Sequence, residues 1–449
     1  MASSMSSTAF YTDHYELTML DAALRAGVAE RPATFEVFTR HLPQGRLHGT
    51  FAGLGRLLEA LEAFVFDPEQ LSWLAERGVV SDRAREWLSG RCFSGTIDAY
   101  REGEYYTADS PVLTVSGPFG EAVILETLVL SILNHDSAIA SAADVLVRAA
   151  SNRPIIEMGS RRTDPEGAVA VARAAYLGGF ASTSNLEAGR RYGVPTAGTA
   201  AHSFTLLFKE EKEAFSAQVA CLGPSTTLLV DTYEPEQGIR NAVAAAGSSL
   251  GAVRIDSGDL VSEAGRARRL LDELGATHTR VIVTGDLDDH ALAALSDAPV
   301  DGYGVGTSVV TGLGRPTAGF VYKLVAVTDE PGAPERPVAK RSPGKAGVGG
   351  RKWSWRARLG HAPEGFAGPE PRYDRPVWVD LIGFTSKPPA DITDARALQH
   401  RVVDHGRVVE KVALADARSY LAEQRDKLPA GEPLVSFRLP PPSQPGIVP

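Results

Sequence analysis

The feature that most constrains this fold is a regular alternation of short apolar runs and helix-like stretches between residues 151 and 330. The apolar runs lie at 154–158, 196–199, 227–230, 252–255, 281–283 and 302–305. The helix-like stretches between them lie at 166–177, 186–192, 234–246, 260–274 and 288–295. Strands that alternate with helices at this spacing predict repeated βα units and a parallel sheet. An irregular α/β barrel of about six to seven parallel strands is favoured, because an eight-fold barrel usually needs about 250 residues.

The chain on either side of this region predicts mixed α and β structure. Residues 1–150 combine a helix start at Asp13 with a strand-like run at 34–42. Residues 331–438 carry a strand pattern followed by a helix pattern. The proline-rich tail at 439–449 is expected to be disordered.

The composition is that of an ordinary soluble protein with two or three domains. The chain has 449 residues, of which 43% are hydrophobic and 22% charged. Its net charge of −9 argues against a nucleic-acid partner, which favours a broadly basic surface. No apolar run approaches the roughly 20 residues that span a bilayer, and no secretory pattern is found, so we expect no membrane partner. The two cysteines, Cys92 and Cys221, cannot form a disulfide framework or a four-cysteine zinc site, which favours a reducing cytoplasm.

Polar residues and glycines cluster directly after the apolar runs. The clusters are GSR at 159–161, DSGD at 256–259, TGD at 284–286 and GTS at 306–308. In barrels and open sheets of parallel strands, ligands bind at the carboxyl ends of the strands. We therefore expect the chemistry on these loops, in an arrangement that suits a phosphorylated sugar and a small carboxylated partner.

Two of the motifs contain side chains that suit anions. Arg161, in EMGSRR, offers bidentate donors to a phosphate or pyrophosphate, although a surface turn with a Glu–Arg ion pair is an alternative. Arg254, in RIDSGDL, could pair with a substrate carboxylate. Asp256 and Asp259 could position Mg²⁺ or ribose hydroxyls, although a helix N-cap accounts for one of these acids.

A histidine and two glycine loops complete the candidates. His202, in GTAAHSF, suits a general base or nucleophile near neutral pH, with a structural histidine as the alternative. The loops VTGD, with Gly285 and Asp286, and GVGTS, with Gly306 and Thr307, follow the last two apolar runs. Loops in that position often bind phosphate through bare backbone N–H groups, and tight packing is the alternative.

The ordered set of motifs resembles the nicotinate phosphoribosyltransferase family. The motifs are TDHYELTM at 12–19, EMGSRR at 157–162, GGFASTSN at 178–185, GTAAHSF at 198–204, RIDSGDL at 254–260, VTGD at 283–286, GVGTSVVT at 304–311 and VYKLV at 321–325. Each fragment alone is unspecific, but this order is highly specific. The resemblance covers about residues 12–325.

The resemblance implies a type II phosphoribosyltransferase fold, in which an α/β barrel joins a mixed domain built from N-terminal and C-terminal segments. Such enzymes act as homodimers with the active site at the subunit interface. The resemblance makes His202 the histidine that ATP phosphorylates, and it places Tyr15, from the neighbouring subunit, against the pyridine ring. Arg254 would pair with nicotinate, with Thr199 and Ser184 beside it.

For the second substrate, phosphoribosyl pyrophosphate, the resemblance and the motifs together assign a set of contacts. These residues are Arg161, Asp259, Gly285, Asp286, Gly306 and Thr307, with Asp256 as a further catalytic residue. Mg²⁺ would be held by the substrate pyrophosphate, without a dedicated set of protein ligands. The expected enzyme is thus an ATP-coupled, ligase-type nicotinate phosphoribosyltransferase of NAD salvage.

Two alternatives stay open in the sequence. Nicotinamide phosphoribosyltransferases share the fold and the histidine, but they carry an aspartate where this chain has Ser184. A carboxylate there would repel nicotinate, whereas a hydroxyl can donate to it, so nicotinate is the preferred substrate. The other alternative is a catalytically silent, nucleotide-binding relative. The presence of His202, Arg254, Asp256 and Gly306 argues against it.

Overall fold

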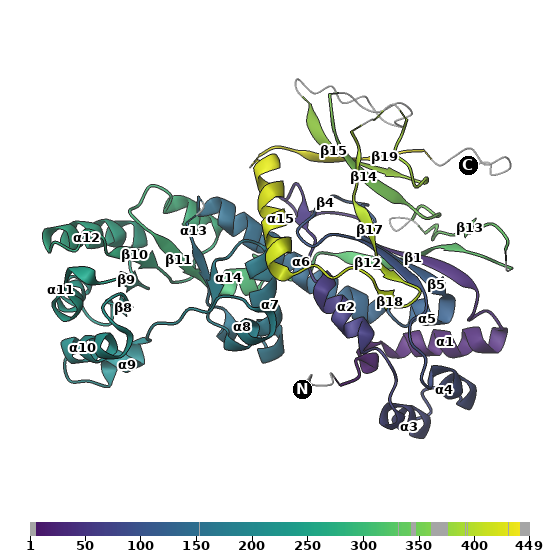
Figure 1. The fold of residues 1–449 in the computed structure, drawn as a ribbon, viewed down its shortest axis with the longest axis horizontal. Coiled ribbons are helices and arrows are strands. Elements are labelled where there is room, and N and C mark those ends of the chain that lie inside the picture. Colours follow the sequence, from purple (N-terminus) through teal and green to yellow (C-terminus); the bar gives the residue numbers. More distant parts are fainter. Residues whose placement is uncertain are drawn as a thin grey trace. The chain divides into compact units, whose positions relative to one another are not determined.

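The protein, seen in a computed structural model, divides into two compact units (Figure 1). The residues described are 6–151, 153–330, 332–342, 347–360, 376–390, 392, 394–429 and 431–440. Unit 1 comprises Met1–Ala138 and Thr317–Pro449, and unit 2 comprises Ile139–Pro316. The expected tail at 439–449 lies outside the described residues, except for 439 and 440.

The unit boundaries differ from the predicted 150/151 and 330/331 by about a dozen residues. At the first boundary, the break falls inside the long helix α6 (Glu126–Ala149), which has no loop to mark it in the sequence. At the second, β12 (Phe320–Val327) pairs with β1 (Pro32–Thr39) and therefore belongs to unit 1. The hydrophobic pattern alone reveals neither the break within α6 nor the pairing of β12 with β1.

Unit 2 is built on a six-stranded parallel sheet. Its spatial order is β7 (Ser182–Thr183), β6 (Ile155–Glu157), β11 (Gly302–Val305), β10 (Arg280–Val283), β9 (Ala252–Ile255) and β8 (Thr227–Leu229). Every neighbouring pair is parallel. The curled half-barrel confirms the predicted irregular α/β barrel.

The prediction of one strand of this sheet, at residues 196–199, is wrong. Residues 196–199 do not form a strand, and only Thr196 makes an isolated parallel bridge to Thr183. The Ala197 N–H donates to the Thr183 carbonyl and the Thr183 N–H to the Pro195 carbonyl, both at 2.9 Å, but Thr196 and Gly198 are exposed, so this run lacks the burial of an inner strand. The short strand β7, which the sequence pattern did not predict, pairs with β6 instead.

Helices connect the strands of unit 2. The five that the sequence predicts are α7 (Pro165–Leu177), α8 (Leu186–Tyr192), α11 (Pro235–Ala246), α12 (Leu260–Glu273) and α13 (Asp289–Ala294). Three further helices are α9 (His202–Leu206), α10 (Glu211–Leu222) and α14 (Thr307–Val310). The core lies between the strands and these helices, with Val253, Val281 and Tyr303 fully buried. Strands buried in this way read as continuous apolar runs, which is why the sequence reveals them.

Unit 1 contains two larger sheets. The antiparallel seven-stranded sheet has the order β13 (Arg336–Pro337), β12, β1, β5 (Leu113–Pro118), β3 (Thr96–Tyr100), β17 (Gln399–Asp404) and β18 (Arg407–Val408). The four-stranded sheet has the order β16 (Arg396–Ala397), β14 (Trp353–Leu359), β15 (Val377–Gly383) and β19 (Leu434–Arg438). Strands β2 (Gly49–Thr50) and β4 (Tyr105–Tyr106) form a separate pair. N-terminal and C-terminal segments therefore share one sheet, because β17 pairs with β3.

The helices of unit 1 pack around these sheets. They are α1 (His14–Ala26), α2 (Leu54–Glu62), α3 (Pro68–Glu76), α4 (Asp82–Leu88), α5 (Phe119–Val123), the first part of α6, and α15 (Leu414–Lys427). Asp13 is the N-cap of α1, as its place in the sequence predicts. The segment from Phe119 to Ala149 is long and apolar enough to cross a membrane by length and composition alone. Because 67% of its most apolar window is buried inside the protein, it has the character of a core helix.

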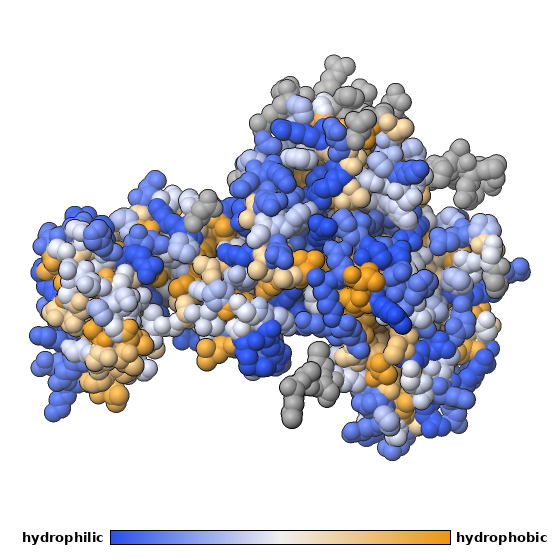
Figure 2. All heavy atoms as spheres, viewed as in Figure 1, coloured by the Kyte–Doolittle hydropathy of each residue, from blue (hydrophilic) through white to orange (hydrophobic). Residues whose placement is uncertain are grey.

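The surface is mainly polar. Figure 2 shows hydrophilic residues over most of the visible face, with apolar patches scattered among them. Exposed large apolar side chains include Tyr15, Leu207 and Tyr233. Single exposed apolar side chains are common on protein surfaces.

Candidate active site at the strand ends of unit 2

The carboxyl ends of the unit 2 strands meet at one edge of the sheet. The strands are parallel, and Glu157 pairs with both Thr183 and Val305, while Val283 pairs with Ile255. The loops that follow these residues therefore emerge side by side. This is the edge at which ligands bind to sheets of this kind.

Glu157 anchors one side of the edge. Its carboxylate is 1% exposed and accepts hydrogen bonds from the Thr183 hydroxyl at 2.5 Å and from the Gly159 N–H. Burial raises the pKa of Glu157, although both hydrogen bonds act in the opposite direction. The glutamate is therefore used within the loop, so the Glu–Arg surface pair considered for this motif is not formed.

Two arginines lie close together at this edge. Arg254, on β9, donates to the Thr199 hydroxyl and to the Ala200 carbonyl, both at 3.0 Å. Its Nε is buried without an acceptor. Burial lowers the pKa of Arg254, Asp256 and Asp231 raise it, and the charge of Arg161 lowers it again. Because the two guanidinium groups influence each other, an anion between them would gain from both.

His202 lies between two partners on neighbouring loops. Its Nδ1 is 3.2 Å from the Thr232 hydroxyl, and its Nε2 is 4.0 Å from Asp256 Oδ2. The other oxygen of Asp256 accepts a hydrogen bond from the Thr284 hydroxyl. The imidazole is 41% exposed and thus accessible to a ligand. A histidine held by a hydroxyl on one side and a carboxylate on the other is oriented for proton or group transfer.

Asp231 stabilises the loop DSGD at 256–259 through hydrogen bonds. Its Oδ2 accepts from the Asp256 N–H at 2.7 Å and from the Ser257 hydroxyl at 2.8 Å, while Oδ1 is buried without a partner. The sequence motifs did not single out Asp231 or Thr232, and they included Thr284 only as part of the TGD cluster. Asp231 and Thr232 directly follow the apolar run at 227–230. Polar residues directly after an apolar run were the signal used for the other loops, so that signal could also have identified these two residues.

The glycine loops bring bare backbone amides to the edge. The N–H groups of Gly285, Asp286, Gly306 and Thr307 have no hydrogen-bond acceptor within the part of the chain that the structure describes. Gly285 has φ +108°, and a Cβ there would lie 2.4 Å from the Asp256 carbonyl oxygen. Asp286 also has a positive φ, +42°, which is uncommon for a residue with a side chain. Unpaired amides in a constrained loop suit an anion.

The other predicted contacts are placed as follows. Ser184 is exposed and follows β7, where its N–H donates to the Glu157 carbonyl at 2.8 Å. Asp259 is the N-cap residue of α12 and accepts from the Ser262 hydroxyl at 2.7 Å, so it acts within the helix start. Tyr15 lies on α1 in unit 1 and is 45% exposed. Burial and the nearby Glu126 carboxylate raise the pKa of Tyr15.

No protein metal centre is found among the described residues. None of them form a group of three or more His, Cys, Asp or Glu side chains that could hold an ion. In the site, one oxygen of Asp231 accepts from the Asp256 N–H, and one oxygen of Asp256 accepts from the Thr284 hydroxyl.

The fold and the site together define a class. A parallel α/β half-barrel presents two arginines, unpaired amides and an oriented histidine at its strand ends. These groups suit an enzyme of the α/β barrel class that acts on phosphorylated, anionic substrates.

Comparison with known proteins gives the family. Residues 10–134 match the model of the nicotinate phosphoribosyltransferase (NAPRTase) N-terminal domain. The chain is 51% identical over 442 residues to the nicotinate phosphoribosyltransferase pncB1 of Mycobacterium tuberculosis, covering 95% of this chain and 94% of the relative. It is 35% identical to the enzyme of that name from Bacillus subtilis, covering 78% and 73%. The crystal structure of human nicotinic acid phosphoribosyltransferase superposes with a TM-score of 0.76 at 25% identity, covering 95% and 97%.

This chain belongs to the nicotinate phosphoribosyltransferase family. The family resemblance and the fold class inferred from the sequence are therefore confirmed.

Proposed function

We propose that this chain transfers the phosphoribosyl group of phosphoribosyl pyrophosphate to nicotinate, in NAD salvage. The ring nitrogen of nicotinate forms a bond to the anomeric carbon of the sugar, and the bond from that carbon to pyrophosphate breaks. The products are nicotinate mononucleotide and pyrophosphate. The observation that carries the proposal is the partly unsatisfied Arg254 beside Arg161, at the strand ends of a chain that belongs to this family.

Arg254 is the group that recognises the nicotinate carboxylate. The orphaned Nε and the two Nη groups form a planar fork of donors, which matches a carboxylate. Thr199 orients that fork through its 3.0 Å hydrogen bond, and the hydroxyl of Ser184 adds a donor. A second copy of the chain completes the site, with Tyr15 stacked on the pyridine ring.

The sugar phosphates bind to Arg161 and to the bare amides of the glycine loops. The amides of Gly285, Asp286, Gly306 and Thr307 hold the 5′-phosphate. When bound, Mg²⁺ neutralises charge on the pyrophosphate, whose oxygens hold it. Asp256, set by Thr284, lies where positive charge develops on the sugar and favours that charge.

ATP acts through His202. The imidazole accepts the γ-phosphoryl group, which releases ADP, and water later takes that group from the histidine as inorganic phosphate. Thr232 holds Nδ1, so Nε2 is the nitrogen that faces the site. The phosphorylated state favours binding of the sugar phosphate. Two exposed, unpaired cysteines fit a cytoplasmic enzyme.

The substrate test is an assay of mononucleotide formation with nicotinate or nicotinamide, phosphoribosyl pyrophosphate and Mg²⁺, with and without ATP. We expect product from nicotinate only. Arg254→Gln should raise the KM for nicotinate about 10- to 100-fold, because a charge-assisted pair is lost. Arg280→Gln, an exposed arginine at the opposite end of β10, is the matched control. Equal use of nicotinamide, or an unchanged KM in Arg254→Gln, would reject the assignment.

The histidine is tested separately with labelled ATP. His202→Ala should lose the stimulation by ATP and the acid-labile phosphate on the protein, while basal turnover without ATP persists. His278→Ala, an exposed histidine of the same unit, should behave like the original chain. Wild-type stimulation in His202→Ala would refute the phosphohistidine.

The shared site is tested by mixing inactive copies. Tyr15→Ala and Arg254→Ala would each disable every site in a homodimer. Because a mixed dimer has one intact site, equal mixing should restore about a quarter of the activity. No recovery after subunit exchange would place both residues in the same copy or make Tyr15 dispensable.

A further inference from the structure

Unit 1 contains a cavity of about 240 Å³ between α15 and the four-stranded sheet. Trp378, Leu428 and Leu434 form apolar walls, and Gln424, Arg396 and Lys427 bring polar groups to it. The indole is fixed, since its Nε1 donates to the Lys427 carbonyl at 3.0 Å. A flat apolar wall with a few converging polar groups is typical of a small-molecule site.

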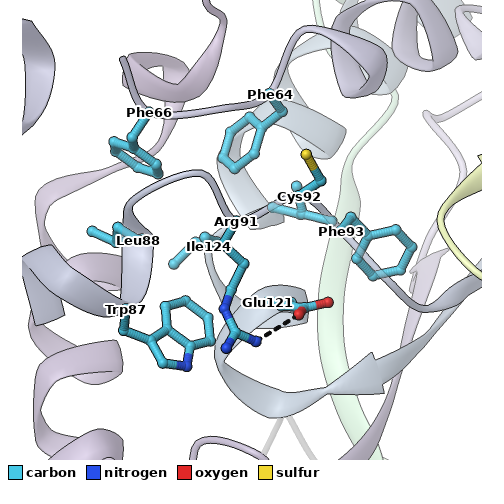
Figure 3. A pocket seen from close by; sticks show the side chains of 10 residues that line it. Phe64, Phe66, Trp87, Leu88, Arg91, Cys92, Phe93, Glu121 and Ile124 are labelled. Atoms are coloured by element: carbon cyan, nitrogen blue, oxygen red, sulfur yellow. Dashed lines mark hydrogen bonds and ion pairs between the residues drawn. The ribbon is translucent and has the colours of Figure 1, made fainter. Parts of the chain in front are cut away.

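Another cavity of unit 1 offers a contrast. Figure 3 shows Arg91, Trp87 and Glu121 at its side. There the guanidinium of Arg91 lies 4.0 Å from the Trp87 ring centre and donates to Glu121 at 2.9 Å, so its polar groups satisfy one another. The space, about 10 Å³, holds roughly one water molecule.

In the larger cavity, the side-chain amide of one mostly buried residue is open to the cavity. Gln424 is only 5% exposed and lines the cavity, and its amide makes no hydrogen bond to any described residue. Buried amides are normally paired, because an unpaired one costs about 1–3 kcal/mol. The amide offers a donor and an acceptor to whatever fills the cavity.

The charged side chains of the cavity have hydrogen-bonding groups that no described residue uses. Arg396 uses Nη1 for Glu104, at 2.8 Å, and for Tyr420, at 2.9 Å, which leaves Nε and Nη2 without acceptors among the described residues. Lys427 has only a 3.8 Å contact with Glu423. The carboxylate of Asp394, which also lines the cavity, has no ion-pair partner within the described chain. The lining of the cavity thus includes donors for an anion and one acceptor for an amine.

Arg356, in contrast, lines the cavity but has its donors already used by other residues. Its guanidinium is 5% exposed and is bound by Asp380 at 2.7 and 3.0 Å, by the Tyr105 carbonyl at 2.7 Å and by Glu104. It gives a rigid floor to the cavity. A ligand would contact the free polar groups of Gln424, Arg396, Lys427 and Asp394.

We infer that this cavity binds a small planar nitrogen heterocycle that carries an anionic group, of the size of a nucleoside monophosphate. The ring lies against Trp378 and pairs edge-on with the amide of Gln424. The anionic group contacts Arg396 and Lys427, and an exocyclic amine contacts Asp394. The site is separate from the strand ends of unit 2 and does not depend on their proposed function.

The test is equilibrium dialysis of the full chain with four labelled probes: AMP, nicotinate mononucleotide, nicotinate and inorganic phosphate. The chain carries Arg161→Ala, which weakens phosphate binding in unit 2. We expect saturable binding of one AMP per chain. Gln424→Leu should weaken it about tenfold or more, because two hydrogen bonds are lost. Lys427→Ala should weaken it about threefold to tenfold, and less at high salt.

The probes and controls separate the possible results. AMP has the amine that Asp394 would accept, so it should bind more tightly than nicotinate mononucleotide or nicotinate. Lys411→Ala, an exposed lysine of unit 1, should leave binding unchanged. If Gln424→Leu does not fold, Gln424→Glu keeps the shape and should repel the anion. The inference is overturned if none of the probes binds saturably, if inorganic phosphate binds as well as AMP, or if the Gln424 and Lys427 variants bind like the parent.

Discussion

Asp256 depends on a hydroxyl from the neighbouring strand for its orientation. Thr284 is 4% exposed and donates to Asp256 Oδ1, which turns Oδ2 toward His202. Thr284→Val has nearly the same shape but no donor. We expect kcat to fall about tenfold to a hundredfold, with the midpoint of thermal unfolding lowered only slightly.

The control for this prediction is Thr227→Val, which changes a partly buried threonine at the start of β8, away from the strand ends. It should keep the original kcat. Steady-state kinetics with nicotinate checks both variants. An unaltered kcat in Thr284→Val would mean that Asp256 is oriented without this hydrogen bond.

The buried Glu157 predicts a pH dependence of stability. Burial raises its pKa above the ordinary value of about 4.5, and in the unfolded chain the ordinary value returns. Its contribution to stability is therefore fully present below about pH 4.5 and is lost as the pH rises through the raised folded-state pKa. The free energy of unfolding should fall more steeply with pH in the original chain than in Glu157→Gln.

Urea unfolding at several values between about pH 4.5 and about pH 7 measures these slopes. Glu236→Gln, an exposed glutamate of the same unit, should keep the original slope. Parallel curves for Glu157→Gln and the original chain would show that the buried carboxyl titrates normally.

The residues of the site that the sequence reveals are those beside glycines or in arginine-bearing motifs. Arg161 and Arg254 were found in this way and His202 as a histidine in the motif GTAAHSF, and the structure places all three at one sheet edge. Asp231 was missed, and Thr284 was named only within its glycine cluster, because their importance comes from a hydrogen bond with Asp256 across the sheet. Such a bond depends on strand order, which a sequence pattern does not contain.

At the scale of elements, the loop after β10 depends on a glycine. At Gly285, φ is +108° and a Cβ would lie 2.4 Å from the Asp256 carbonyl oxygen. Gly285→Ala should therefore displace this loop from the β9 loop and cost about 1–3 kcal/mol of stability. Activity should be lost, because the amides of the loop leave their positions.

Gly275→Ala separates backbone strain from steric clash. Gly275 also has a positive φ, +76°, but a Cβ there has no atom within 4 Å. It should cost about 1 kcal/mol and leave the KM for phosphoribosyl pyrophosphate unchanged. If both variants lose activity equally, strain alone would explain the effect and the close approach would be unimportant.

Elements with local signals were predicted well, and elements set by tertiary contacts were not. Helix α8 (Leu186–Tyr192) has the predicted bounds because Asn185 caps its start and Gly193, in a left-handed conformation, ends it. The run at 196–199 was wrongly expected to be a strand, since only the neighbouring β7 decides which segment pairs with β6. Two residues, Ser182 and Thr183, are too few to give a period.

At the scale of the whole molecule, the two units have separate hydrophobic cores. One core joins residues before Ala138 with residues after Pro316, and the other lies between these positions. Sequence patterns favour domains that are continuous along the chain. They therefore identified the βα region, but they could not show that β12, which follows this region, belongs to unit 1. The pairing of β12 with β1 joins segments nearly 300 residues apart, which no local pattern indicates.

The separate cores predict that a defect in one unit stays local. In unit 1, Arg356 is bound between Asp380 and Glu104, and all three side chains are at most 5% exposed. Arg356→Leu would leave two buried carboxylates short of a cation, at a cost of about 3–5 kcal/mol. Hydrogen exchange should then accelerate in β14 and β15 but not in β9 and β10 of unit 2.

Protonation provides the internal control for this prediction. Burial already raises the pKa of Asp380, and the loss of Arg356 would raise it further. The deficit of Arg356→Leu should therefore shrink as the pH falls, because a protonated Asp380 needs no cation. Replacing both partners, in Arg356→Leu with Asp380→Leu, should recover much of the stability, since two apolar side chains leave less charge unpaired. Equal acceleration of exchange in β9 and β14 would show instead that the two units unfold together, so that the separate cores do not act as separate cooperative units.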